Sequence, residues 1–192
     1  MARPRGFDEG RVVDAAMETF WRNGYEATST RELSQRTGLG PSSLYNTFGG
    51  KQQLYVRALH RYCETATARQ VEVLQQPGPV RARLRALMLQ AIDADLAPDE
   101  PRGCFAVNSA VEVAAFDPEI RDEVRHNFAR VEDELCAVLT LGQGTGEIRS
   151  DRSARALARQ VQSTYYGLRV LAQASDDRDA FLETVEITLA GL

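Results

Sequence analysis

The segment from Thr28 to Lys51, TSTRELSQRTGLGPSSLYNTFGGK, constrains the fold more than any other part of the chain. It predicts a short helix that ends at Gly38, a second short helix after Gly40, and a stop at Gly49. Two helices of about two turns each, joined by a glycine turn, must pack on other helices to be stable. This arrangement is typical of a helix-turn-helix whose second helix enters the DNA major groove.

Residue types at the ends of these two helices support the prediction. Ser29 and Glu32 fit a capping box, in which the hydroxyl and the carboxylate each accept a hydrogen bond from an otherwise unpaired amide. Pro41 suits the first position of the second helix, where an N–H group is not needed. Small polar residues form one side of that helix, and Arg31 and Lys51 flank it. The region therefore offers hydrogen bonds and positive charge to DNA.

Helical spacing continues along the chain and predicts an all-α protein of about nine helices. A first helix, capped by Asp8 and ended by Gly24, precedes the motif, and a long fourth helix covers about 51–75. Pro77-Gly78-Pro79 follows, and we interpret it as the linker between an N-terminal head and a C-terminal body. Five further helices are expected in the body, over about 80–96, 103–116, 118–141, 152–174 and 178–190.

Breaks and caps define the ends of the body helices. Pro98-Asp-Glu-Pro101 is expected to end the first of them, and Asp117 to cap the third, with Pro118 at its first position. We expect a loop from Gly142 to Gly146, and Asp151 as the cap of the next helix.

Charge is divided between the two predicted domains, a helix-turn-helix head over residues 6–66 and a helical body over residues 78–192. The chain has 23 Lys and Arg against 27 Asp and Glu. Residues 1–62 carry a net charge of +3, whereas residues 63–192 carry −7. A basic head on an acidic body suits a protein that presents one end to DNA phosphates.

Other sequence signals narrow the class of protein. Cys63, Cys104 and Cys136 form no C-x-x-C pair, so we expect reduced thiols in a cytoplasmic protein, with redox sensing by Cys104 left open. No stretch is long and apolar enough to span a membrane, and no signal peptide is recognisable. No nucleophile–base set, phosphate loop or metal-ligand cluster is present. We therefore predict no enzyme, no cofactor and no metal site.

The head contains residues at the spacing of a known family. They are Asn23-Gly24-Tyr25-Glu26-Ala27-Thr28-Ser29, Arg31-Glu32-Leu33, Gly38-Leu39, Leu44-Tyr45 with Phe48, and Lys51 with Leu54. These residues resemble the DNA-binding head of the TetR family, the tetracycline-repressor-like bacterial regulators. Arg102 to Asn108 and Tyr166 to Ala172 resemble stretches of that family's C-terminal domain. The resemblance implies a transcriptional regulator with a three-helix head and a body that binds an effector and dimerises.

The resemblance also implies which residues contact DNA. They are Thr30, Arg31, Ser42, Ser43, Tyr45, Asn46, Thr47 and Lys51. Trp21 and Phe48 occupy positions that hold the head together in the family. Family members often have a polar residue in place of Gly40 and Lys or Gln near Pro41, so one potential contact is absent here.

Dimerisation follows from the small size of the head. A single head with few contacts would bind weakly, whereas two heads on a twofold axis read a palindrome with half-sites about 34–36 Å apart. In the family, the last two helices of each subunit form the interface. Here they carry Leu157, Val161, Tyr165, Leu168, Leu171, Phe181, Val185 and Leu189, which could equally be intrachain core. Gly167 costs about 1 kcal/mol relative to alanine inside a helix, and close approach of a partner helix would explain it.

The effector site is the least explicit part of the sequence. Phe105, Asn108 and Glu112 lie close together on an otherwise apolar helix, and buried polar groups need partners. The alternatives are that Asn108 caps a neighbouring helix or packs at the interface, and that Glu112 is solvated. We also include Met88, Phe128 and Tyr165 in the candidate pocket, although their helical spacing suits a core better than a pocket lining.

We therefore predict a ligand-responsive repressor that a small, hydrophobic molecule releases from a palindromic operator. Its partners would be double-stranded DNA, the effector and a second copy of the chain, with no membrane. An activator or an effector-independent DNA-binding protein of the same fold is the first alternative. A helical enzyme or scaffold that uses the N-terminal helices only for packing is the second.

Overall fold

The computed structural model describes residues 7–97 and 102–192. Within these ranges the protein has nine α-helices and no strand, which confirms the predicted fold class. The helices are α1 (Glu9–Asn23), α2 (Thr30–Thr37), α3 (Pro41–Phe48), α4 (Lys51–Leu74), α5 (Val80–Asp95), α6 (Phe105–Glu112), α7 (Pro118–Gly144), α8 (Ala154–Leu171) and α9 (Arg178–Ala190). The predicted start of the head at residue 6 and the predicted break at Pro98–Pro101 lie outside the described residues.

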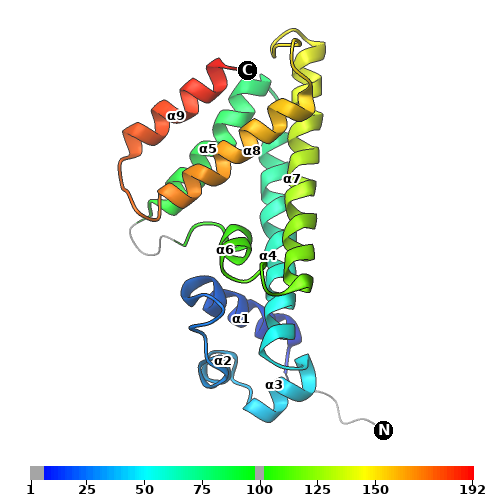
Figure 1. The fold of residues 1–192 in the computed structure, drawn as a ribbon, viewed down its shortest axis with the longest axis vertical. Helices are drawn as coiled ribbons and strands as arrows, with labels where there is room; N and C mark the ends of the chain where they lie inside the picture. The colour runs from blue at the N-terminus through cyan, green and yellow to red at the C-terminus, as the bar shows by residue number, and fades with distance from the viewer. Residues whose placement is uncertain (1–6, 98–101) are drawn as a thin grey trace.

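The molecule is elongated, with the head at one end and the body at the other (Figure 1). Helices α1, α2 and α3 form the head, and α5, α8 and α9 lie at the far end of the body. Helix α4 begins in the head and runs along α7 into the body (Figure 1). One continuous helix therefore connects the predicted DNA-reading end with the rest of the protein.

Capping residues begin the first two helices as the sequence predicts. Asp8 accepts a hydrogen bond from the Gly10 amide at 2.9 Å, and Ser29 accepts one from the Glu32 amide at 3.1 Å. The Glu32 carboxylate instead accepts from the Asn23 side chain at 2.8 Å, so the serine half of the predicted capping box is the half that forms. The exchange ties the end of α1 to the start of α2.

Two hydrophobic clusters fill the molecule. The first joins the head to α6 and the start of α7, and it includes Phe20, Tyr55, Phe105 and Ile120, all at most 1% exposed. The second joins α5, α7, α8 and α9 to the end of α4 at Leu74. The head thus shares its core with a helix from the C-terminal half of the chain.

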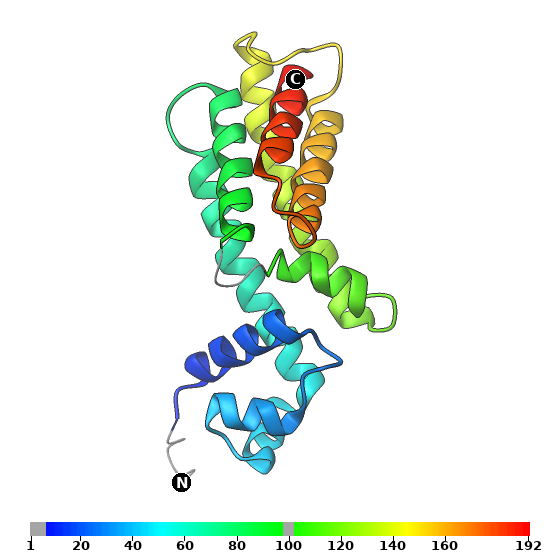
Figure 2. The same cartoon turned by 90° about the vertical axis from the view of Figure 1, so that its left-hand side faces the viewer.

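The turn at Pro77-Gly78-Pro79 is not the linker that we predicted. It joins α4 to α5 at the end of the molecule away from the head (Figure 2). Leu74, just before the turn, and Val80, just after it, are both buried in the body core. The change from head to body therefore occurs along α4, because that helix contributes to both clusters.

Three helix ends in the body differ from the prediction. Helix α6 ends at Glu112 rather than near Phe116, because Val113 leaves the helical conformation with a φ of −122° and a turn follows before Asp117 caps α7. Helix α7 continues to Gly144 through the predicted loop, and a β-carbon on Gly142 would lie 2.4 Å from Ile148. Ser153 rather than Asp151 caps α8, through the Ala156 amide at 3.2 Å.

Trp21 connects the head to the segment before α6. Its indole Nε1 donates to the carbonyl oxygens of Arg102, at 3.2 Å, and Gly103, at 3.3 Å. The Arg102 guanidinium lies over the indole ring and also pairs with Glu18. Phe48 is buried inside the head. Trp21 thus holds the head to the body, while Phe48 packs within the head itself.

The start of α5 is stabilised by a distant carboxylate. Pro79 precedes the helix and provides no side-chain cap, but Glu147 accepts hydrogen bonds from the Val80 amide at 2.8 Å and the Arg81 amide at 2.7 Å. Desolvation raises the pKa of Glu147, but these hydrogen bonds outweigh it and hold the pKa below its ordinary value of 4.5.

Replacing Glu147 with glutamine is expected to reduce the acid sensitivity of folding. The Glu147 pKa is lower in the folded chain than in the unfolded one, so its stabilisation is complete above about pH 4.5 and is lost as the pH falls through the folded pKa. Urea unfolding at a series of pH values measures the slope. The matched control is Glu183→Gln on the exposed side of α9, which should keep the wild-type slope. Parallel profiles for Glu147→Gln and wild type would contradict this role.

Candidate DNA-binding surface and sensor body

The residues predicted to contact DNA lie on the surface of the head. Thr30, Arg31, Ser42, Ser43, Tyr45 and Asn46 are exposed, and Thr47 and Lys51 are half-buried. The core of the head is formed by other residues of the same helices, including Leu33, Leu44 and Phe48. The structure therefore leaves all eight side chains accessible and brings three of them, Thr30, Tyr45 and Lys51, around one hollow of about 320 Å³.

Two helix N-termini add to this surface. Gly40 precedes α3 and Gly50 precedes α4, and neither helix has a side-chain cap. The first amides of such helices, together with the helix dipole, are suited to bind phosphate oxygens. Tyr45 is 67% exposed and lies in α3 beside these ends. The surface thus combines main-chain donors, neutral hydroxyl and amide groups, and a few cationic side chains.

The position of Lys51 is set by an aromatic ring. Its Nζ lies 4.3 Å from the centroid of the Tyr25 ring, in a cation–π contact. The Tyr25 ring meets the ring of Tyr55 edge to face, with centroids 4.9 Å apart. Because Tyr55 is fully buried, this stack links the half-buried lysine to the core of the head.

The six residues predicted to line an effector pocket do not surround one cavity. Met88 and Tyr165 are buried in the body core, and Phe105 is buried in the cluster shared with the head. Phe128 packs against Tyr166, with ring centroids 4.8 Å apart and the rings tilted by 38°. Phe105, Asn108 and Glu112 nevertheless line one cleft, of about 430 Å³, between α1 and α6. The sequence could not separate these six residues, because helical spacing does not show which neighbouring helix each face packs against.

Asn108 and Glu112 both have partners within the chain. The Asn108 side chain donates to the Arg102 carbonyl at 3.0 Å, in the segment before its own helix, so it does not cap a neighbouring helix. Glu112 is half-buried, and its carboxylate accepts hydrogen bonds from the amides of Tyr25 and Glu26 in the head. Both polar side chains therefore have hydrogen-bond partners within the protein and do not need a ligand to supply them.

A different set of buried polar atoms has no partner. Gln70 Oε1, on α4, and the Tyr166 hydroxyl, on α8, are buried without a hydrogen bond, while Gln70 Nε2 donates to the Tyr165 hydroxyl at 3.1 Å. We name Gln70, Tyr165 and Tyr166, together with Phe128 of the adjoining helix α7, the α4–α8 seam. Sequence reasoning missed Gln70 and Tyr166, although a glutamine within the inward spacing of α4 was a usable signal.

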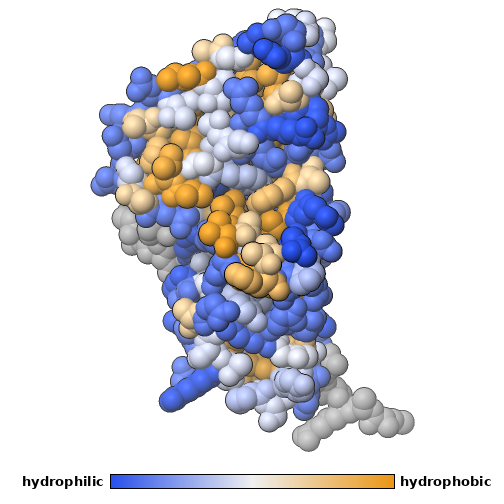
Figure 3. All heavy atoms as spheres, in the orientation of Figure 1, coloured by the Kyte–Doolittle hydropathy of each residue, from blue (hydrophilic) through white to orange (hydrophobic). Residues whose placement is uncertain are grey.

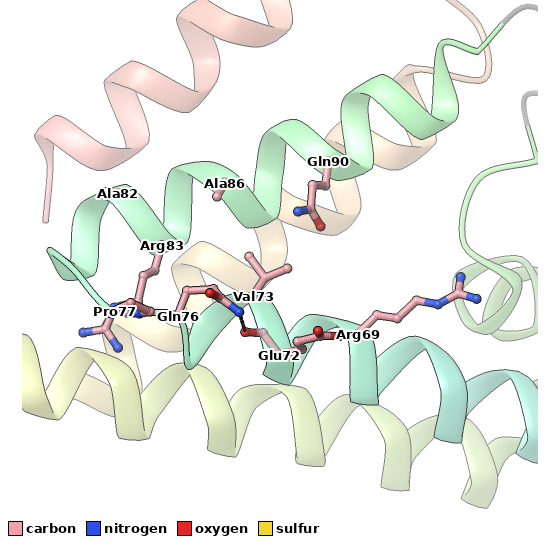
Figure 4. A pocket seen from close by; sticks show the side chains of 9 residues that line it. All are labelled: Arg69, Glu72, Val73, Gln76, Pro77, Ala82, Arg83, Ala86 and Gln90. Atoms are coloured by element: carbon pink, nitrogen blue, oxygen red, sulfur yellow. Dashed lines mark hydrogen bonds between the residues drawn. The ribbon is translucent and has the colours of Figure 1, made fainter.

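A surface groove of about 470 Å³ also lies between α4 and α5 (Figure 4). Its walls include Glu72, Val73, Ala86 and two arginines, Arg69 and Arg83. The arginine side chains extend in opposite directions along the groove (Figure 4), so they do not converge on one anion. None of the residues predicted to bind an effector lines it.

Most of the residues predicted for the dimer interface are already buried in their own chain. These are Leu157, Val161, Tyr165, Leu168, Phe181, Val185 and Leu189, at 0–6% exposure. Leu171 is 57% exposed, and so are its neighbour Val170, at 47%, and Ile187 on α9, at 67%. A β-carbon on Gly167 would meet no atom of the chain within 4 Å.

The surface of the body differs from that of the head. Hydrophobic residues gather on the body face that carries α8 and α6, whereas the head is mostly hydrophilic on this side (Figure 3). No helix within residues 7–97 and 102–192 is long and apolar enough to cross a membrane.

Comparisons with known proteins agree with these features. Residues 12–58 match the family described as "Bacterial regulatory proteins, tetR family", and residues 80–187 match "Tetracyclin repressor-like, C-terminal domain". The chain is 31% identical, over all of both chains, to the uncharacterized HTH-type transcriptional regulator YezE of Bacillus subtilis (strain 168). It is 27% identical to the HTH-type transcriptional repressor ComR of Escherichia coli (strain K12), over 97% of this chain and 90% of the relative.

A solved structure gives the same result for the fold. The TetR family transcriptional regulator CifR, as a cysteine mutant complexed with 26 bp double-strand operator DNA, superposes with a TM-score of 0.83. The two sequences are 26% identical, and the match covers 98% of each chain. With both of its halves matched and its full length shared with a relative, this chain belongs to the TetR family of bacterial transcriptional regulators.

Proposed function

We propose that the protein is a homodimeric repressor that binds a palindromic DNA operator and is released from it by a small molecule. The observation that carries the proposal is the accessible polar surface of α3, flanked by Arg31, Lys51 and two helix N-termini without side-chain caps. Backbone amides and cations hold phosphates, while hydroxyl and amide side chains can contact base edges. The operator complex of CifR and the repressor ComR support the same role.

The proposed dimer forms through the outer sides of α8 and α9. Val170, Leu171 and Ile187 leave apolar area exposed there, and Gly167 leaves room for a helix to approach closely. The apolar body face in Figure 3 carries α8. Because the sequence-predicted residues hold each subunit together from the inner side, the interface would consist of their outward-facing neighbours.

The proposed effector occupies the α4–α8 seam. A buried polar atom without a hydrogen bond costs about 1–3 kcal/mol, and this seam has two, on Gln70 and Tyr166. A mostly apolar molecule with one hydrogen-bond donor and one acceptor would satisfy both, with its apolar part against Phe128. Helix α4 then connects this seam to Lys51. A coupling free energy of about 1–3 kcal/mol along it would change operator affinity roughly 5- to 150-fold.

Removing the two cations from the head is expected to weaken DNA binding and its salt dependence. Arg31→Ala/Lys51→Ala loses two phosphate contacts per subunit, or four in a dimer. The slope of log affinity against log salt should then fall by about 3–4. The measurement is fluorescence anisotropy with double-stranded DNA from immediately upstream of the gene, titrated at several salt concentrations.

The matched control removes two arginines from the far end of the body. Arg155 and Arg159 lie on α8 and pair with Glu132 of α7, away from the head. Arg155→Ala/Arg159→Ala should therefore keep the wild-type salt slope. An unchanged slope in the Arg31→Ala/Lys51→Ala variant would rule out the proposed surface.

A further inference from the structure

Glu112, the last residue of α6, is bound to the head by both of its carboxylate oxygens. Oε2 accepts a hydrogen bond from the Tyr25 amide at 2.9 Å, and Oε1 accepts one from the Glu26 amide at 2.8 Å. Both donors belong to the turn between α1 and α2, more than eighty residues away in sequence. Hydrogen bonds to an ionised acceptor are shorter and stronger than neutral ones. The body therefore fixes the main chain of the head at this turn.

Gly24 makes the approach of the carboxylate possible. Its φ is +83°, a conformation that glycine adopts without steric cost. A β-carbon at this position would lie 2.9 Å from Glu112 Oε2 and 3.1 Å from Oε1. The turn thus needs glycine both for its backbone geometry and for the space that the carboxylate occupies.

The fixed turn leads directly to the DNA-binding surface. Tyr25 receives the Glu112 hydrogen bond on its amide, and its ring lies under the Lys51 ammonium at 4.3 Å. The same ring packs edge to face against buried Tyr55. A displacement of the Tyr25 backbone would move the ring, and with it the surface on which the lysine rests.

The other end of α6 is held by the body. Arg169, on α8, donates to the Gly103 carbonyl at 2.8 Å while pairing with Asp95 of α5. Gly103 lies two residues before α6, and Glu112 ends that helix. A short, eight-residue helix therefore spans from a buried contact with α8 to the turn that supports Lys51.

We propose that Glu112 is a positioning residue for DNA binding, which sets the Tyr25 turn from the body and, through the Tyr25 ring, places Lys51 against phosphate. The proposal rests on the proposed function, since it assigns to Glu112 a role in operator affinity. It also gives α8 a route to the DNA-binding surface that is separate from α4.

The test compares Glu112 with Glu26, a second glutamate that lies in the turn to which Glu112 binds. Removing an acidic group near DNA should by charge alone leave affinity unchanged or raise it. Glu26→Ala, at an exposed side chain, should do so. Glu112→Ala should instead weaken binding to the upstream DNA, by roughly 5- to 50-fold at about 0.1 M salt, because each subunit loses a well-placed lysine. Its salt slope should fall by about 2 for the dimer.

A double-mutant cycle separates positioning from general destabilisation. In a Lys51→Ala background, Glu112→Ala should cost little further affinity, because the lysine that it positions is already absent. Tyr25→Leu keeps the amide that Glu112 binds but removes the ring, and it should reproduce the Lys51→Ala salt slope in a folded protein. This second variant tests the route even where Glu112→Ala lowers the thermal melting temperature.

The outcomes separate this inference from the proposed function. If the wild-type chain binds the upstream DNA without a steep salt slope, the proposed function itself fails. If wild type and Lys51→Ala behave as expected but Glu112→Ala binds like Glu26→Ala, the positioning role alone is overturned. Equal losses from Glu112→Ala in the wild-type and Lys51→Ala backgrounds would also overturn it, because the effect would then bypass the lysine.

Discussion

Replacement of Arg169 by methionine is expected to lower the free energy of unfolding by about 3–5 kcal/mol. The guanidinium forms a two-pronged pair with Asp95, with Nε to Oδ2 at 2.7 Å and Nη2 to Oδ1 at 2.8 Å. Arg169 is 9% exposed and Asp95 is 3% exposed. Methionine fills similar volume but leaves the Asp95 carboxylate in the core without its cationic partner and removes one of the two donors to the Gly103 carbonyl.

The same geometry keeps Arg169 charged. Burial lowers the pKa of Arg169, but the hydrogen bonds to Asp95 and the neighbouring phenol and thiol groups outweigh this effect, so the pKa lies above its ordinary value. The Arg169 guanidinium therefore stays charged in the core, beside the Asp95 carboxylate that it pairs with.

Urea unfolding followed by circular dichroism at neutral pH measures the loss, and an exposed ion pair provides the control. Arg178 pairs with Asp93 at 2.9 Å, but both side chains are about half exposed. Arg178→Met should therefore cost only about 0–1 kcal/mol. The double variant Asp95→Asn/Arg169→Met should recover part of the loss, since no uncompensated charge remains buried. Equal costs for Arg169→Met and Arg178→Met would show that the buried pair stabilises the fold no more than the exposed pair does.

Truncation of Phe105 to alanine is expected to cost about 3–5 kcal/mol. The ring is 1% exposed and meets the rings of Tyr55 at 5.3 Å and Tyr62 at 5.6 Å, both edge to face. Its loss would leave a cavity at the point where α6 packs against α4, between head and body. Because this contact joins the head to the body, we expect the head and the body to be destabilised together.

Two probes measure this effect together. Trp21 is the only tryptophan and lies at the head–body contact, so its fluorescence reports that region, while circular dichroism reports all helices. Phe116→Ala is the matched control, because that ring is 86% exposed and its loss should change stability by less than about 0.5 kcal/mol. If Phe105→Ala proves as mild as Phe116→Ala, the ring would contribute little to the packing of α6 on α4 and would serve mainly to line the cleft between α1 and α6.

Local signals predicted most of the fold and the exposure of the side chains proposed to contact DNA. Helix starts at Asp8, Ser29 and Asp117 depend on side chains that bond to amides two or three residues away. The exposed surface of α3 depends on residues within the same short motif. Such features survive the step from sequence to structure because the interacting groups are neighbours along the chain.

The residues of the proposed effector site and dimer interface could not be predicted in the same way. The partners of Glu112 are more than eighty residues away, and no spacing within α6 indicates them. Helix α8 has apolar residues on two sides, and only the packed structure shows that Val161 and Leu168 face the chain's own core while Leu171 remains exposed. Gly167 was the informative signal, because its open side identifies the outward face.

The core that α6 shares with the head has a consequence for engineering and for evolution. A head exchanged between relatives would meet a foreign ring in place of Phe105 and a foreign side chain in place of Glu112. A chimera that changes DNA preference should therefore carry residues 102–113 together with residues 7–66, although the two segments are far apart in sequence. For the same reason, substitutions at Gly24 and at Glu112 should be inherited as a pair.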